Sequence, residues 1–236
     1  MPINYINGIR LHRSVTAGLH RVVSRQEYLN KINVFPVPDG DTGTNMAYTL
    51  TTIEESIRDK AYKDIKKMSM AIADSALDGA RGNSGAILAQ FFVGFADGIK
   101  EKVSLTAREF AQAAIHAKDY AYDALTHPRE GTILSVIKAW AESLLESCNN
   151  SNDIVSMLSK GLDDAQISLE NTPKQLDVLA KAGVLDAGAQ GFVDMLEGIN
   201  EYITSGKITE SDLEVIDQEN ENIDFVTNEK YRYCTE

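Results

Sequence analysis

The sequence predicts an all-α protein, an antiparallel bundle of about eight helices. Apolar residues recur at three- and four-residue spacing, as in the stretches 110–124 and 133–145. Strand-like alternation is nearly absent before the last fourteen or so residues. Alanine is common on the apolar faces, which permits close helix packing. Because each apolar face needs a partner, we expect the helices to pack around one core.

Each expected helix rests on this periodicity, and two have capping signals at their starts. Thr106 with Glu109 fits a capping box, and Thr172 before Pro173 fits an N-cap followed by proline at the first helical position. The predicted helices span residues 8–30, 44–58, 64–79, 84–100, 106–125, 131–147, 151–169, 173–182 and 188–204.

Composition and length predict one globular domain with an appendage. The chain has 236 residues, of which 43% are hydrophobic, and only 5 prolines. We expect the helical domain to cover residues 1–204 and an acidic linker to follow it. The closing stretch IDFVTNEKYRYCTE has the β-branched and aromatic mix of a strand. A lone strand cannot form a fold, so residues 205–236 are predicted to hold the linker and the start of a further, truncated domain.

Charge and hydropathy exclude several classes of protein. The net charge of −12 disfavours a nucleic-acid surface, which needs clustered Lys and Arg. No run of about 18 apolar residues indicates a transmembrane helix, and the N-terminus lacks the pattern of a signal peptide. We therefore expect a soluble cytoplasmic protein. Cys148 and Cys234 have no metal-binding spacing and are predicted to be free thiols.

Glycines and small polar residues cluster where helices are expected to begin. Helix N-termini offer unpaired N–H groups and a positive dipole end, so a glycine-rich loop that leads into a helix suits an anion. We expect the bundle to gather several such ends at one rim. The stretches are PVPDGDTGTNM (36–46), DGARGNSGA (78–86) and VLDAGAQG (184–191), with HPREGTI (127–133) as a weaker fourth case.

Asp39 and Asp41 are the candidate metal ligands. They lie two residues apart, and in an extended segment this spacing points both carboxylates to the same side. Such hard oxygen ligands suit Mg²⁺, which uses one or two carboxylates and completes its shell with water and phosphate. Two nearby prolines restrict the backbone. The alternative, an acidic turn followed by a helix cap from Thr42 or Thr44, stays open on spacing alone.

The other loops also allow two interpretations each. Gly79 fits a helix stop, and Asn83 or Ser84 fits the cap of the next helix. Arg81 suits either a phosphate or the C-terminal end of the preceding helix. Asp186 is either a cap or a ligand. No catalytic residue is predicted, and the histidines are interpreted as surface or packing residues because none pairs with a nucleophile in a known motif: His12, His20, His116 and His127.

Several blocks together resemble one known family. They are NVFPVPDGDTGTNM, GARGNSGAILAQFFVGF, EGTILSV, SLENTPKQLDVLAKAGVLDAGAQGF and the closing YRYCTE. In this order they resemble the DhaL-type nucleotide-binding domain of the dihydroxyacetone kinase family, most closely the N-terminal kinase domain of bacterial fatty acid kinase. The resemblance covers about residues 8–204. It implies an eight-helix antiparallel barrel that binds ATP at one rim, with the phosphates held through two Mg²⁺ ions chelated by aspartates.

The resemblance also implies roles for individual residues. It places the metal carboxylates at Asp39 and Asp41, and a third family aspartate falls on or near Asn33, whose carbonyl oxygen can coordinate. Thr42 replaces a family histidine, a departure that fits the fatty acid kinase branch. The implied nucleotide-binding residues are Thr42, Gly43, Thr44 and Asn45 at the phosphates, Asn83, Ser84 and Gly85 closing over the nucleotide, Gly131 and Thr132 beside the base, and Asp186, Ala187 and Gly188 on the same rim.

The implied activity is ATP- and Mg²⁺-dependent phosphorylation of a fatty acid presented by a separate fatty-acid-binding carrier protein. The product is an acyl phosphate, and no general base is needed because a fatty acid is already ionised at neutral pH. Two alternatives remain: a nucleotide-binding subunit of a dihydroxyacetone kinase, and a nucleotide-binding regulatory module without turnover. Thr42 and the acidic tail count against the first. A homodimer is a possible assembly.

Overall fold

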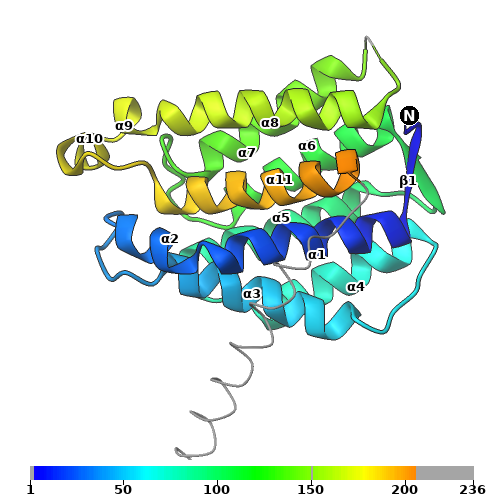
Figure 1. Ribbon diagram of the computed structural model, residues 1–236, viewed down its shortest axis with the longest axis horizontal. Coiled ribbons are helices and arrows are strands. Elements are labelled where there is room, and N and C mark those ends of the chain that lie inside the picture. The colour runs from blue at the N-terminus through cyan, green and yellow to red at the C-terminus, as the bar shows by residue number, and fades with distance from the viewer. Residues whose placement is uncertain (1–2, 150, 206–236) are drawn as a thin grey trace, which may run out of the picture.

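The computed structural model describes residues 3–149 and 151–205, and this part of the chain is almost entirely helical (Figure 1). The all-α prediction is therefore confirmed. Eight of the helices have between 14 and 19 residues: α1 (Gly8–Ser24), α3 (Thr42–Ile57), α4 (Ile65–Asp78), α5 (Gly82–Gly98), α6 (Ala107–Asp123), α7 (Ile133–Ser147), α8 (Ile154–Glu170) and α11 (Ala187–Ser205). Three shorter helices lie in the connections: α2 (Gln26–Ile32), α9 (Thr172–Gln175) and α10 (Asp177–Ala182).

The eight long helices form a closed antiparallel ring. Each packs against the next long helix along the chain, and α11 packs against α1 to complete the barrel (Figure 1). Because successive long helices run in opposite directions, alternate connections lie at the same end. The connections α1–α3, α4–α5, α6–α7 and α8–α11 therefore meet at the end where α2, α9 and α10 lie. This topology brings the four glycine-containing loops to one rim.

Two predicted helices are divided in the structure. The helix expected at 8–30 breaks at Arg25, whose ψ of 2° leaves the helical region between α1 and α2. The Arg25 side chain reaches Asp194 on α11 (Nε to Oδ2, 3.3 Å) and lies over the Tyr28 ring at 4.4 Å. The helix expected at 173–182 is divided at Leu176 into α9 and α10.

Of the two predicted caps, one is confirmed and one is wrong. Thr106 and Glu109 form the capping box at the start of α6. Thr172 is the first residue of α9 and does not cap it. Its hydroxyl instead donates to the Leu169 carbonyl (2.8 Å) and accepts from the Asp186 amide (3.3 Å), because the residue lies buried between α8 and the loop before α11.

A small sheet was not predicted. Strands β1 (Tyr5–Asn7) and β2 (Ser104–Thr106) pair antiparallel at the barrel end opposite the four loops. Three residues are too few to show strand alternation. The linker and further domain expected in the tail lie outside the described residues from position 206 onward. Among the helices that the structure describes, none is both long and apolar enough to cross a membrane.

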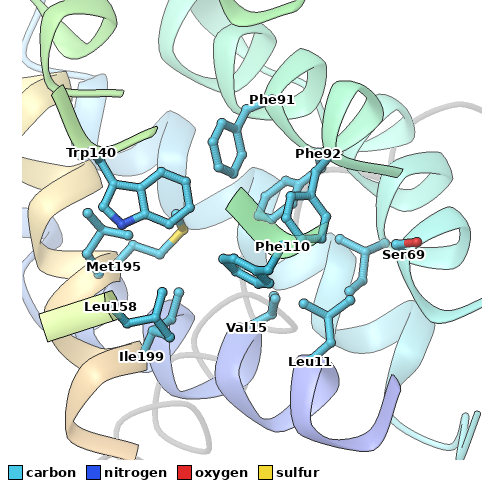
Figure 2. A pocket seen from close by; sticks show the side chains of 13 residues that line it. Leu11, Val15, Ser69, Phe91, Phe92, Phe110, Trp140, Leu158, Met195 and Ile199 are labelled. Atoms are coloured by element: carbon cyan, nitrogen blue, oxygen red, sulfur yellow. The ribbon is translucent and has the colours of Figure 1, made fainter. Parts of the chain in front are cut away.

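Apolar side chains fill the inside of the barrel. Trp140 packs edge-on against Phe110 and Phe192, and Phe91 packs edge-on against Phe92 and Phe192. Figure 2 shows Trp140, Phe91, Phe92 and Phe110 around a residual apolar cavity of about 50 Å³. An apolar interior of this kind offers no partner to a charged ligand, so polar chemistry is confined to the ends of the barrel.

Two glycines allow α1 and α11 to approach closely. A Cβ at Gly198 would lie 2.4 Å from the Ala17 carbonyl oxygen, and a Cβ at Gly18 would lie 2.8 Å from the Met195 carbonyl oxygen. Both clashes involve backbone, which cannot move without separating the helices. The closure of the ring therefore depends on glycine, which has no side chain, at these two positions.

We expect Gly198→Ala to lower the free energy of unfolding by about 1–3 kcal/mol, although alanine favours helix more than glycine does. Urea denaturation of the variant and the wild type gives the difference. Gln112→Ala, at an exposed position of α6, is the control and should change the value by less than about 0.5 kcal/mol. A Gly198→Ala protein as stable as the wild type would contradict the packing constraint.

Candidate functional site

The four connections at one rim surround a cavity of about 730 Å³. Every one of the four loops singled out in the sequence contributes to its wall. Ten of the fifteen predicted site residues line it: Asn33, Asp39, Asp41, Thr42, Asn45, Asn83, Ser84, Thr132, Asp186 and Gly188. The structure therefore brings the predicted residues together, while their roles as ligands stay predictions.

The other five predicted residues lie behind the wall and pack the loops. A Cβ at Gly43 would lie 2.3 Å from the Gln26 carbonyl oxygen of α2, so this glycine allows α2 and α3 to touch. The Thr44 amide and hydroxyl both pair with the Asn30 side chain of α2, at 3.0 and 2.9 Å. Positions 85, 131 and 187 are likewise absent from the cavity wall.

The first connection presents oxygen atoms to the cavity. Asn33 is buried, and its Nδ2 donates to Asp39 Oδ1 at 2.7 Å. Gly40, between the two aspartates, has a φ of +67°, a conformation that favours glycine. Asp39 and Asp41 are themselves exposed on the cavity wall.

These oxygen atoms fit a hard divalent cation. The Oδ1 atom of Asn33 is buried and has no hydrogen-bond partner among the described residues, as expected of an oxygen that awaits a ligand. Two carboxylates and one amide oxygen match the preference of Mg²⁺ for oxygen donors. Within residues 3–149 and 151–205, no group of three His, Cys, Asp or Glu side chains could hold a metal ion. A site here would therefore need the amide oxygen, water or a ligand oxygen as well.

The structure does not show a simple helix cap at the start of α3. Asp41 occupies the N-cap position, yet its side chain makes no capping hydrogen bond. Thr42 is the first helical residue, and Thr44 is paired with Asn30. The two aspartates are therefore not needed to satisfy this helix end.

The first turn of α5 is open toward the cavity. Arg81 is its N-cap and makes no side-chain capping bond. The amides of Gly82, Asn83 and Ser84 have no acceptor in the described part of the chain, and all three residues line the cavity. Such free N–H groups at the positive end of a helix dipole form an anion site.

A single buried carboxylate accepts hydrogen bonds from the first turns of both α7 and α11. Oδ1 of Asp186 accepts from the Ile133 amide at the start of α7 (3.1 Å) and from the Ala189 amide in α11 (2.8 Å). Thr132 adds a cap to the Leu134 amide at 3.3 Å. Two of the four helix N-termini at this rim are thus satisfied by the protein itself.

The buried position of Asp186 opposes ionisation of its carboxyl group. Burial raises its pKa to about 6, although hydrogen bonds from the Ala189, Ile133 and Gly188 amides act in the opposite direction. The side chain is 5% exposed. No cation forms an ion pair with it among the residues that the structure describes.

Apolar side chains also line the cavity. Leu125, Ile133 and Leu176 line it from the α6–α7 and α8–α11 connections, and Ile87 lines it from α5. An aromatic ring can be buried against such a surface. The cavity wall therefore combines apolar side chains with the free end of α5 and the aspartates.

Two basic residues of the wall were missed in the sequence. His127 was interpreted as a surface or packing residue, and Arg129 was not singled out, but both line the cavity. The sequence feature that could have identified them is the stretch HPREGTI, in which Arg129 lies two residues before Gly131. Leu125 and Leu176 were also missed, because single leucines in a helical protein indicate core packing first.

We expect the contribution of Asp186 to stability to decrease as the pH rises. Its folded-state pKa of about 6 exceeds the ordinary value of 3.8, so between these two values the folded protein binds more protons than the unfolded protein. The contribution is complete below about pH 4 and is lost as the pH rises through about 6. In urea denaturation, Asp186→Asn should gain about 2 kcal/mol relative to the wild type between pH 4.5 and pH 7.5.

Asparagine suits this test because it keeps an oxygen that can accept from Ile133 and Ala189 without a charge. Asp186→Ala is the comparison, since it leaves both amides without an acceptor and should be less stable than Asp186→Asn by about 1–3 kcal/mol at all pH values. Parallel pH profiles for Asp186→Asn and the wild type would show that burial of the charge has no such effect.

Comparisons with known proteins agree with this architecture. A family model described as DAK2 domain matches residues 36–201. An uncharacterised protein of Staphylococcus aureus strain USA300 is 35% identical over 242 residues, and one of Staphylococcus saprophyticus is 32% identical over 243 residues. Each match covers 99% of this chain and 44% of the relative, so the chain spans less than half the length of these curated relatives.

Solved structures show the same fold. The native dihydroxyacetone kinase of C. freundii matches with a TM-score of 0.60 and 19% identity, over 81% of this chain and 34% of that one. The C. freundii enzyme in complex with AMP-PNP and Mg²⁺ matches with a TM-score of 0.60 and 20% identity, over 85% of this chain and 34% of that one. At this identity the likeness extends to the fold alone. With the family model matching most of its length, the chain belongs to the DAK2 domain family.

Proposed function

We propose that the rim cavity binds ATP with Mg²⁺ and that the chain acts as the ATP-binding domain of a kinase. The observation that carries this proposal is the meeting of the uncapped α5 N-terminus with Asp39 and Asp41 in one cavity. Free amides suit phosphate oxygens, and carboxylates suit the metal that accompanies them. The structure of the C. freundii enzyme in complex with AMP-PNP and Mg²⁺ supports the same ligands here.

The polarity of the cavity suggests how a nucleotide lies in it. The base would pack against Ile133 and Leu176 near the closed ends of α7 and α11. The phosphates would meet the amides of Asn83 and Ser84. This orientation uses the free helix end for the anionic part and leaves the self-capped ends to the uncharged part.

Asp39, Asp41 and the Oδ1 atom of Asn33 would hold Mg²⁺, and two ions are part of the proposal. When bound, Mg²⁺ supplies charge neutralisation at the β- and γ-phosphates. Asn33 also fixes Asp39 by the 2.7 Å hydrogen bond, which orients one carboxylate before the cation binds. Holding the ligands in advance lowers the entropy lost on binding.

We propose a fatty acid as the acceptor, presented by a separate fatty-acid-binding carrier protein. A fatty acid carboxylate is already ionised at neutral pH, so its phosphorylation needs no base. The second candidate is dihydroxyacetone phosphorylation with a substrate-binding subunit. The fold likeness to dihydroxyacetone kinase favours that candidate, whereas Thr42 counts against it.

We expect Asp41→Ala to weaken Mg²⁺-dependent ATP binding by about 100-fold or more, because the metal loses one of its two carboxylates. Isothermal titration calorimetry with and without Mg²⁺ measures the effect. Asp59→Ala is the matched control, since Asp59 is an exposed aspartate in the connection at the opposite end of the barrel. Metal-independent ATP binding that survives Asp41→Ala would exclude the proposed site.

Phosphoryl-transfer assays with labelled ATP separate the two acceptors. We expect label transfer to a fatty acid loaded on its carrier protein, with none to dihydroxyacetone loaded on its own binding subunit. The assay should use the full-length protein, because the chain covers 44% of its relatives. Transfer to dihydroxyacetone alone would establish the second candidate.

A further inference from the structure

Acidic side chains outnumber permanent cations on the wall of the cavity. Asp39, Asp41 and Asp186 line it, and Arg129 is the single Lys or Arg side chain among its described lining residues. The other basic side chain there is His127. A polyphosphate that enters this cavity adds several negative charges to those of the aspartates. A fixed cation on the wall would offset part of this charge in addition to any metal.

The backbone around Arg129 is held in place. The Thr132 hydroxyl donates to the Arg129 carbonyl at 2.7 Å. The neighbouring Glu130 carboxylate accepts from the Tyr122 hydroxyl at 3.0 Å and from the Ser135 hydroxyl. These bonds tie the loop to α6 on one side and to α7 on the other, so the Cα atom of Arg129 has a defined position at the rim.

The Arg129 side chain, in contrast, is exposed and not engaged. Within the described part of the chain it forms no ion pair, no side-chain hydrogen bond and no contact with an aromatic ring. Two other arginines near this rim differ: Arg25 pairs with Asp194, and Arg81 lies over the Tyr48 ring at 5.4 Å. Arg129 is therefore available for a ligand in the cavity.

The position of Arg129 suits the phosphate end of a nucleotide. Its loop connects α6 to α7, and α6 is the ring neighbour of α5, whose free N-terminus opens into the same cavity. The guanidinium has five N–H donors in a planar arrangement that can bind two phosphate oxygens at once. It also stays charged at all working pH values.

We propose that Arg129 is a catalytic residue that binds the terminal phosphates of the nucleotide during phosphoryl transfer. The inference rests on the proposed function. In the transfer, an acceptor oxygen, such as a fatty acid carboxylate oxygen, forms a bond to the γ-phosphorus while the bond from that phosphorus to the β,γ-bridging oxygen breaks. ADP leaves with the electron pair of that bond, and no proton moves when the acceptor is a carboxylate. Arg129 donates N–H groups to the oxygens on which negative charge increases.

The test compares binding of ATP, ADP and AMP to the wild type and to Arg129→Ala, Arg129→Gln and Arg129→Lys, by calorimetry in the presence of Mg²⁺. We expect Arg129→Ala and Arg129→Gln to weaken ATP binding by about 10–100-fold and ADP binding by less, and to leave AMP binding within about twofold. Arg129→Lys should recover part of the loss, because it keeps the charge without the bidentate geometry. Thermal unfolding midpoints should stay unchanged, since the side chain is exposed.

Arg58→Ala is the matched control, because Arg58 is an exposed arginine just after α3, at the opposite end of the barrel. In the full-length enzyme, kcat should fall in Arg129→Ala and recover in part when guanidinium ion is added. Equal losses for ATP, ADP and AMP, or no loss at all, would overturn the role of Arg129 while the proposed function stands. A wild type that binds no nucleotide would overturn both.

Discussion

The contact between α1 and α11 is the constraint on which the rest of the structure depends. It joins the first and last long helices of the described chain. The contact is close because Gly18 and Gly198 have no side chain that would hold the two backbones apart. An open row of eight helices would expose an apolar face at each edge. Closure buries both faces and fixes the number of helices around the barrel. That number in turn places four connections at one end, which is why residues more than a hundred positions apart share one cavity.

The helix ends at this rim are used in two different ways. Asp186 satisfies α7 and α11 together, and its carboxylate is buried without a cation among the described residues. The end of α5 is left free instead. If every end were capped, the rim would be more stable and could not attract an anion; if none were capped, the loops would have little to hold them. The division ties the starts of α7 and α11 together and leaves a positive dipole end where a ligand can reach it.

The sequence predicted the repeating features well and the irregular ones poorly. Seven of the eight long helices were expected within a few residues, because helical periodicity extends over about four or more turns in each; the eighth, α1, ends six residues before the expected helix. The break at Arg25 was not expected, since it coincides with a contact to Asp194 that lies 169 positions away. Strands β1 and β2 pair across about a hundred residues and are too short for a pattern. For the site, local glycines indicated which loops matter, whereas the capping of α7 by Asp186, 53 positions away, depends on tertiary structure.

The features that suit the rim for binding also destabilise it in the absence of a ligand. Asp39 and Asp41 place two carboxylates on the cavity wall, Asn33 buries an amide oxygen with no described partner, and the first turn of α5 leaves N–H groups unpaired. Each feature is unfavourable alone, and a cation with a phosphate chain would relieve all of them at once. Because such a ligand binds the folded state and not the unfolded one, its binding free energy adds to the stability of the barrel. The rim therefore depends on the apolar core and the α1–α11 contact to remain folded before a ligand binds.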